Sequence, residues 1–483
     1  QYRSALNCFE RMQKEEGLSA DGVIFTSILK ACGNIQDIQK GKETHDEIVE
    51  RCLLWKNIVL GNALVDMYAK CGELRKAHQA LEELSDRDVA TWSTLIAGYA
   101  EEGRGHKALE CFEHMQREDL SPNKVTFISI LKACGSIGAI DKGKIIHNEI
   151  ISMGLLKRNI ELNNALVDMY AKCGYLAKAQ GVLETLPIRN VVTWSALIAG
   201  YVQQGSCQKA LECFEKMQME GIMPDGVTFT CMLKACSSIG IIDKGQQIHH
   251  EIVKNGYLDK STVLGTALVD MYAKCGMLQK AQDVLEELPV RNVVSWSALI
   301  AGYSQARQGD VVLRCIAQMQ NEGLAPNEIT FLSVLNACNQ AGKLDKAQSY
   351  YEDMSRKYGI TPKLEHHTSI AVLFGCIGCL DKAISMVMAM PFSGDPSIWV
   401  ALLGACRKWG NVKLGRFSFD QVIHIDNKLA AAYFLMADIY AVVGMKEDAE
   451  KIEAMRTSIG VDMCGKVNNF GWDNACELKN NAL

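Results

Sequence analysis

The sequence has no hydrophobic run that approaches the roughly 18 apolar residues of a membrane-spanning helix. We therefore expect no membrane partner. Proline is scarce, with 8 residues in 483, which favours long helical stretches. The chain also lacks an excess of positive charge, because 51 Lys and Arg stand against 56 Asp and Glu for a net charge of −5. Overall charge gives no support for nucleic-acid binding, so such a function must come from local residues.

Cysteine does not reach the level of a disulfide scaffold. The 19 cysteines are about 4% of the chain and odd in number, which favours a reducing compartment. Hydrophobic residues at 48% and charged residues at 22% exclude a disordered chain. The start, Gln1-Tyr2-Arg3, has no initiator Met, signal segment or Arg- and Ser-rich presequence. This start is typical of a fragment, and no targeting peptide is visible in it.

A unit of 102 residues repeats along the chain, and it splits into three similar parts of about 35, 36 and 31 residues. Five independent markers share the interval. They are Trp92, Trp194 and Trp296; Met67, Met169 and Met271; His45, His147 and His249; Pro122, Pro224 and Pro326; and the -AC- cysteines Cys32, Cys134, Cys236 and Cys338.

Each part has the pattern of two short helices joined by a turn. Between residues 89 and 123, Trp92, Leu95 and Tyr99 fall at helical spacing, Gly103 breaks the pattern, and a second amphipathic helix follows. The apolar faces of one such hairpin cannot be buried alone, so neighbouring hairpins must stack. We therefore expect an all-α fold, an α-solenoid of helix-turn-helix repeats.

Hairpins of these three lengths in rotation, with the strings VVTWSALIAGY, LKACG, GKIIH and MYAKCG, resemble the pentatricopeptide repeat (PPR) family. The alternating lengths resemble its PLS subclass, found in plant organellar RNA-processing factors. The resemblance implies a right-handed superhelix of stacked PPR hairpins. It implies a PLS array of about four P-L-S triplets over residues 1–395, E-like helical repeats over 396–462 and a degenerate tail over 463–483.

The resemblance further implies that each repeat reads one RNA base through its fifth and its last residue. The P-type and S-type repeats hold small hydrogen-bonding side chains at both registers: Asn62 and Asp88, Ser93 and Asn123, Asn164 and Asn190, Ser195 and Asp225, Thr266 and Asn292, Ser297 and Asn327, Thr368 and Asp395. These residue types also favour helix N-caps and turns. That alternative explains the last register well, but the fifth register poorly, because it lies inside the first helix.

The chemistry of the two registers suggests a target. An Asp carboxylate only accepts hydrogen bonds and suits guanine or uracil, whereas an Asn amide donates and accepts and suits adenine or cytosine. In the family, Ser or Thr at the fifth residue favours purines and Asn favours pyrimidines. The implied partner is single-stranded RNA of sequence U-A-N-Y-G-N-A-A-N-G. The L-type positions are left unspecified because their fifth residues include two that cannot hydrogen-bond: Thr26, Ile128, Thr230 and Leu332.

Other registers have expected roles. In the family, the second residue clamps the base, and here it is Val59, Ala90, Val192, Val263 or Val294. Glu161 and Glu365 depart from this pattern. Three lysines at the ends of first helices either contact phosphates or are solvated there, namely Lys70, Lys172 and Lys274. The repeat tryptophans lie on the apolar stripe, where we expect core packing.

The sequence contains no motif that indicates an enzyme. Some PLS proteins end in a DYW-type zinc cytidine deaminase, whose signature is H-x-E followed by P-C-x-x-C. The H-x-E strings at His45, His147 and His249 recur at the repeat period, so the solenoid explains them. The C-x-x-C string at Cys376 to Cys379 has no preceding proline. We expect no catalytic residue, no metal site and no cofactor.

The resemblance implies a specificity factor for C-to-U RNA editing in the mitochondrion or chloroplast. A deaminase of the DYW type, or another editing cofactor, would act in trans through the E-like region. An organellar RNA stability, splicing or translation factor is an alternative. A protein-binding scaffold is another, but it predicts no restricted residue set at the fifth and last registers.

Overall fold

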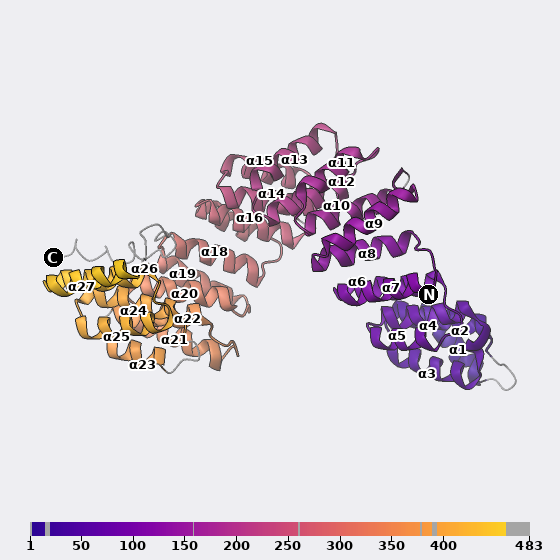
Figure 1. The fold of residues 1–483 in the computed structure, drawn as a ribbon, viewed down its shortest axis with the longest axis horizontal. Helices are drawn as coiled ribbons and strands as arrows, with labels where there is room; N and C mark the ends of the chain where they lie inside the picture. Colours follow the sequence, from indigo (N-terminus) through magenta and orange to yellow (C-terminus); the bar gives the residue numbers. More distant parts are fainter. Residues whose placement is uncertain are drawn as a thin grey trace. The chain divides into compact units, whose positions relative to one another are not determined.

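The computed structural model describes residues 2–14, 20–157, 159–258, 261–376, 379–388 and 394–459. The regular structure of these residues is helical throughout, with no strand among them (Figure 1). They divide into two compact units, one ending at Ile239 and the other starting at Gly240. Within the described ranges, no helix is long and apolar enough to cross a membrane.

The first unit consists of the second helix α1, six consecutive helical hairpins from α2 to α13, the first helix α14 and two short 3-10 turns. Its elements are α1 (Tyr2–Lys14), α2 (Gly22–Ile35), α3 (Ile38–Glu50), η1 (Leu53–Lys56), α4 (Ile58–Lys70), α5 (Leu74–Glu83), α6 (Val89–Glu101), α7 (Gly105–Arg117), α8 (Lys124–Ile137), α9 (Ile140–Ser152), η2 (Leu155–Lys157), α10 (Ile160–Lys172), α11 (Leu176–Thr185), α12 (Val191–Gln203), α13 (Cys207–Met219) and α14 (Gly226–Ile239).

The second unit continues the same alternation. Its helices are α15 (Ile242–Lys254), α16 (Thr262–Lys274), α17 (Leu278–Glu287), α18 (Val293–Gln305), α19 (Gly309–Asn321), α20 (Glu328–Ala341), α21 (Leu344–Arg356), α22 (Leu364–Cys376), α23 (Leu380–Met388), α24 (Pro396–Trp409), α25 (Val412–Ile425), α26 (Ala430–Val443) and α27 (Lys446–Ser458).

Within each unit, the first helices of successive hairpins pack in a row. In the first unit, α2, α4, α6, α8, α10, α12 and α14 each pack against the next, and in the second unit α16, α18, α20, α22, α24 and α26 do the same. The two helices of each hairpin that lies within one unit also pack against each other, as α2 does against α3 and α16 against α17. This arrangement buries the apolar stripe that an isolated hairpin would expose, and it confirms the expected stack of helix-turn-helix repeats.

The hairpin turns follow from the sequence. The chain between α6 and α7 reverses at Gly103, whose φ of 73° lies in the left-handed region that costs glycine least. The N-terminus of α6 is closed by a capping box, in which the Asp88 side chain accepts from the Thr91 backbone and the Thr91 side chain accepts from the Asp88 backbone. Local side-chain chemistry therefore fixes where α6 begins.

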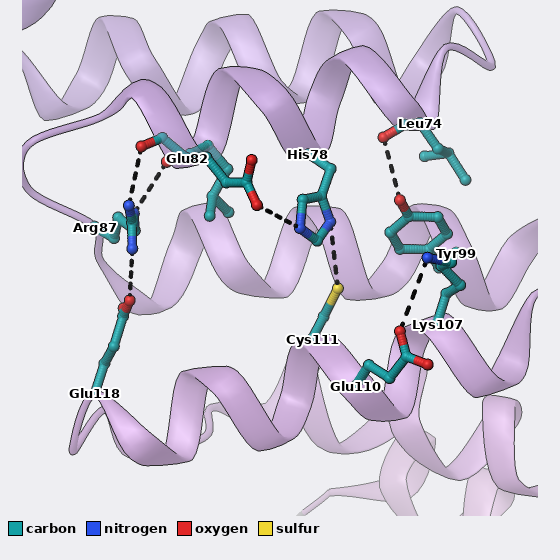
Figure 2. A network of polar contacts seen from close by, with 10 residues as sticks. Leu74, His78, Glu82, Arg87, Tyr99, Lys107, Glu110, Cys111 and Glu118 are labelled. Atoms are coloured by element: carbon teal, nitrogen blue, oxygen red, sulfur yellow. Dashed lines mark hydrogen bonds and ion pairs between the residues drawn. The ribbon is translucent and has the colours of Figure 1, made fainter.

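The tryptophans are core residues, as expected from their place on the apolar stripe. Trp92, Trp194 and Trp296 are only 3–4% exposed. Trp92 also lies beside a polar network that joins the end of α5 to α7. Figure 2 shows Arg87 of this network, which donates to the carbonyl oxygens of Leu81 and Glu82 and pairs with Glu118 at 2.8 Å. Burial therefore rules out the exposed tryptophan face that base stacking would need.

Candidate nucleic-acid interface

The last residue of each P-type and S-type repeat stands at the N-terminus of the next first helix. Asp88, Asn123, Asn190, Asn292 and Asn327 are the N-caps of α6, α8, α12, α18 and α20. Asp225 accepts from the Thr228 backbone N–H at 2.8 Å, and Asp395 caps α24. The N-cap explanation of this register is therefore correct, and it leaves part of each side chain available for another contact.

The fifth and last residues of a repeat are brought together across the hairpin. Asn62 donates from Nδ2 to Asp88 Oδ2 at 3.1 Å, although 26 residues separate them. Ser195 donates to Asp225 Oδ1 at 3.3 Å, and Ser297 donates to Asn327 Oδ1 at 3.2 Å. The two registers that the sequence singled out thus form contacting pairs at these sites.

Two further pairs have other geometries. Asn292 donates from Nδ2 to Thr266 Oγ1 at 3.4 Å. Ser93 and Asn123 are joined through Thr126, whose hydroxyl is 2.6 Å from Ser93 Oγ and 3.1 Å from Asn123 Oδ1. These contacts keep the fifth and last side chains of both repeats in one polar cluster.

The remaining two pairs have no hydrogen bond between their members among the described residues. Asn190 caps α12, whereas the Oδ1 atom of Asn164 is buried without a partner in the described chain. Thr368 donates to the Leu364 carbonyl at 2.8 Å, and Asp395 accepts from the Ser397 backbone.

The fifth-register serines are more enclosed than the sequence suggested. Ser93, Ser195 and Ser297 are 3–5% exposed. Each hydroxyl bonds the carbonyl four residues earlier and the hydroxyl of the threonine at the third position of the next repeat. Asn62, Asn164, Thr266 and Thr368 are partly exposed instead. The three serines are therefore enclosed, whereas the other four side chains of this register are partly open to solvent.

The second-register side chains form an exposed aliphatic series. Val59, Val192, Val263 and Val294 are 51–62% exposed, and Ala90 is exposed as well. The L-type repeats continue this series with side chains that the sequence reasoning did not include, namely Val23, Val125, Val227 and Ile329, which are 53–73% exposed. The sequence could have identified them, because each is the second residue of its repeat. Glu161 interrupts the series and forms an ion pair with Lys124.

The lysines at the ends of three first helices are engaged within their own helices. Lys70 pairs with Asp66 at 2.7 Å. In the next two triplets, Lys172 pairs with Asp168 at 2.7 Å and Lys274 pairs with Asp270 at 2.8 Å. These exposed pairs do not decide between phosphate contact and solvation. A phosphate contact there stays a prediction.

The histidines of the H-x-E strings are structural. His45, His147 and His249 each place Nδ1 2.9 Å from the hydroxyl of a tyrosine in the next first helix. Burial lowers the pKa of all three imidazoles. Among the described residues, no group of three His, Cys, Asp or Glu side chains could hold a metal ion. Two residues of the C-x-x-C string, Ile377 and Gly378, lie outside the described residues.

The cysteines that recur in the registers of Cys32 and Cys111 are small buried core residues. Burial raises the pKa of Cys32 to about 11 and that of Cys111 and Cys134 to about 12. Because the thiolate is the nucleophile and the metal ligand, these three thiols are unreactive near neutral pH.

Comparison with known proteins was made by sequence and by structure. A model of the PPR repeat family matches residues 87–136, 189–238 and 291–340, and a PPR repeat model matches 62–89, 227–257, 266–293 and 329–358. The Arabidopsis thaliana pentatricopeptide repeat-containing protein At2g13600 is 32% identical over 98% of this chain and 73% of its own. A second relative, At4g38010, is 35% identical over 92% of this chain and 79% of its own. A third relative, At2g03380, which is named mitochondrial, is 32% identical over 94% of this chain and 65% of its own.

Solved structures share the fold. The crystal structure of the pentatricopeptide repeat protein PPR10 in complex with an 18-nt psaJ RNA element has a TM-score of 0.72 with 18% identity, over 95% of this chain and 72% of that one. The structure of PPR10 from maize has a TM-score of 0.60 with 17% identity, over 94% of this chain and 76% of that one. At these identities, the likeness concerns the arrangement of the helices.

Proposed function

The chain belongs to the pentatricopeptide repeat (PPR) family, and on that premise we propose that it binds single-stranded RNA sequence-specifically, one base per repeat. The observation that carries the proposal is the contact between the fifth and last residues of one repeat, as in Ser195 with Asp225. The second residue of the same repeat, Val192, lies three residues before Ser195 on α12 and is 51% exposed. A flat base needs these two elements, an apolar face to stack on and a polar edge to pair with. The solved complex of PPR10 with an RNA element supports the same ligand class.

The fifth register separates large bases from small ones by volume. In this proposal the smaller side chains at this register, Ser93, Ser195, Ser297, Thr266 and Thr368, leave room for a purine. Asn62 and Asn164 are longer and partly exposed, so they fill that space and suit a pyrimidine. The proposed target, U-A-N-Y-G-N-A-A-N-G, follows from these pairs and from the Asp or Asn at the last register.

We further propose that the protein is a PLS-type specificity factor for organellar C-to-U editing. The rotation of hairpins of about 35, 36 and 31 residues supports the PLS assignment. Helices α24 to α27 fall in the E-like region that would engage a DYW-type deaminase supplied in trans. A relative that is named mitochondrial supports an organellar location.

RNA binding at one fixed salt concentration tests the RNA proposal. One oligonucleotide carries U-A-N-Y-G-N-A-A-N-G, and the second has A in place of the G assigned to repeat 191–225. The wild type should prefer G, and Asp225→Asn should prefer A, each by roughly 5- to 100-fold. The matched control is Asp141→Asn, which changes a side chain that is 89% exposed on the second helix α9. Equal binding of both RNAs by both proteins would favour a protein-binding scaffold instead.

A further inference from the structure

The last-register side chains have a fixed orientation. Asp225 Oδ1 accepts from the Thr228 backbone N–H at 2.8 Å and from the Thr228 hydroxyl at 2.7 Å. A backbone N–H can only donate, so the atom that faces it must be an oxygen. The same reasoning settles which way an asparagine amide points. Asn327 accepts through Oδ1 from the Thr330 backbone and hydroxyl, both at 2.9 Å.

A third-register threonine forms this double contact at five repeat boundaries. Asp88 Oδ1 accepts from Thr91 at 2.9 and 2.8 Å, and Asn123 Oδ1 accepts from Thr126 at 3.0 and 3.1 Å. Asn190 Oδ1 accepts from the Thr193 backbone N–H at 2.9 Å. The Thr193 hydroxyl lies 3.3 Å from Oδ1 and 2.8 Å from the Asn190 carbonyl oxygen. Thr126, Thr193, Thr228 and Thr330 are at most 1% exposed, and Thr91 is fully buried. Water therefore cannot substitute for their hydroxyls.

Once Oδ1 is occupied, each residue type offers one kind of outer atom. The outer atom of Asn is Nδ2, which donates only, and the outer atom of Asp is Oδ2, which accepts only. Within the described residues, neither Nδ2 of Asn123 and Asn327 nor Oδ2 of Asp225 has a hydrogen-bond partner. A donor suits the bare ring nitrogen of adenine or cytosine, and an acceptor suits the ring N–H of guanine or uracil. The double contact with the threonine thus removes an ambiguity, because a free amide could face the base with either its donor or its acceptor atom.

The L-type repeats lack this arrangement. Their last residues are followed at the third register by Leu60, Leu162, Leu264 and His366, none of which carries a hydroxyl. Asn57 is held only by the Leu60 backbone N–H, at 3.1 Å. Asn159 forms no side-chain cap, and its Nδ2 donates to the Leu155 carbonyl at 3.0 Å. Among the described residues, the double contact therefore occurs only in repeats whose fifth and last residues form a restricted set, at five of the seven. At Asn292 the Ser295 hydroxyl donates to the backbone carbonyl oxygen instead, at 2.9 Å.

We propose that Thr91, Thr126, Thr193, Thr228 and Thr330 are positioning residues that set which hydrogen-bonding edge of the preceding repeat's last residue faces the RNA base. This inference rests on the proposed RNA-binding function. It narrows the pyrimidine assigned to Asn164 and Asn190 to cytosine. Asp395 is followed by Ile398 at the third register and is held by a single backbone N–H. Its repeat should discriminate between bases less strongly.

The experiment removes one hydroxyl with almost no change of shape. Thr228→Val is compared with the wild type by measuring the ratio of Kd values for the G and A oligonucleotides at repeat 191–225. The ratio should fall at least threefold, whereas discrimination at the base assigned to repeat 89–123 should stay unchanged. Thr228→Ser keeps a hydroxyl and should restore the ratio. The control Thr185→Val removes a hydroxyl that donates to the Val182 carbonyl in its own second helix.

The outcomes separate the two proposals. A wild-type protein that does not distinguish G from A contradicts the proposed function. A wild type that distinguishes them, together with a Thr228→Val variant that keeps the same ratio, contradicts the positioning role. If Thr228→Val melts at a lower temperature than the wild type, Thr330→Val provides a second site. There the ratio of Kd values is measured for RNAs with A or G at the base assigned to repeat 293–327. An unchanged ratio there overturns the inference as well.

Discussion

Trp92 donates a hydrogen bond from its indole Nε1 to the Glu118 carboxylate at 2.8 Å, which ties the first helix of a hairpin to the end of its second. The contact recurs one and two triplets later, between Trp194 and Glu220 at 3.1 Å and between Trp296 and Glu322 at 2.8 Å. In each triplet an arginine just before the hairpin pairs with the same glutamate, at 2.8 to 3.2 Å. The indole, the carboxylate and the guanidinium form one repeated structural unit.

Glu118→Ala should destabilise the first unit by about 1–3 kcal/mol, because the buried Trp92 indole N–H loses its acceptor and Arg87 loses its carboxylate. Urea unfolding followed by circular dichroism measures the change. Glu110→Ala is the matched control on the same helix. Its exposed carboxylate is 3.9 Å from Lys107, so the change should stay within about 0.5 kcal/mol. Equal effects of the two substitutions would show that the Trp92 contact does not stabilise the hairpin.

Acid should weaken the contact between α9 and α10. Burial, with a smaller contribution from Lys178, lowers the pKa of His147 below its ordinary value of 6.5. As pH falls through 6.5, the unfolded chain binds the proton more readily than the folded chain, so stability falls with pH. His147→Leu should therefore make the melting temperature less dependent on pH between 7 and 5. The exposed His106 provides the control, since His106→Leu should leave the slope near that of the wild type. An identical slope for both variants would contradict the prediction.

The sequence predicted the fold well because the 102-residue period repeats every marker several times. Trp92 and Gly103 alone place a helix and a turn, and the copies at Trp194 and Trp296 show that neighbours must stack. The partner of Trp92 could not be read in the same way. Glu118 recurs at the same period, as Glu220 and Glu322, but the period does not show which side chain it contacts. Packing brings it to the indole 26 residues earlier.

The candidate site was predictable in its registers but not in its hydrogen bonds. Asp and Asn at the last register fit an N-cap and a base-reading residue equally well, and the structure shows that Oδ1 is used by the cap. Periodicity also could not show that Ser195 is buried against Thr228, because that contact joins two repeats through side-chain orientation. The exposure of Val23 and Val125 was predictable, since they share the register of Val59.

Asp88→Asn should change the base preferred by repeat 58–88 from U to C. Asn62 stays in place and keeps the pyrimidine preference, whereas the outer atom of residue 88 changes from an acceptor to a donor. Burial raises the pKa of the Asp88 carboxyl, but hydrogen bonds from Thr91 and Asn62 outweigh it and hold that pKa below its ordinary value of 3.8. Asp88 is therefore ionised at neutral pH. The wild type should bind the RNA with U more tightly, and Asp88→Asn should bind the RNA with C more tightly. In each case the two Kd values should differ by roughly 5- to 100-fold.

The neighbouring exposed Asp86 is the control for that experiment. Asp86→Asn removes the same charge two residues away, so it should leave the U preference intact. A loss of preference in Asp86→Asn would mean that net charge, and not the edge of residue 88, selects the base.

Glu161→Val should strengthen RNA binding by roughly 3- to 10-fold at low salt, because it removes a negative charge near the phosphates and restores an apolar face at the second register. Glu161 now pairs with Lys124, so the substitution also releases a cation toward the RNA. Glu110→Val removes an equivalent charge from the second helix α7 and is the control. If both variants gain equally, the effect is one of overall charge. If only Glu161→Val gains RNA affinity, the second-register series contacts the RNA. The gain should then shrink as added salt screens the charge. It should not vanish, because the apolar contact remains.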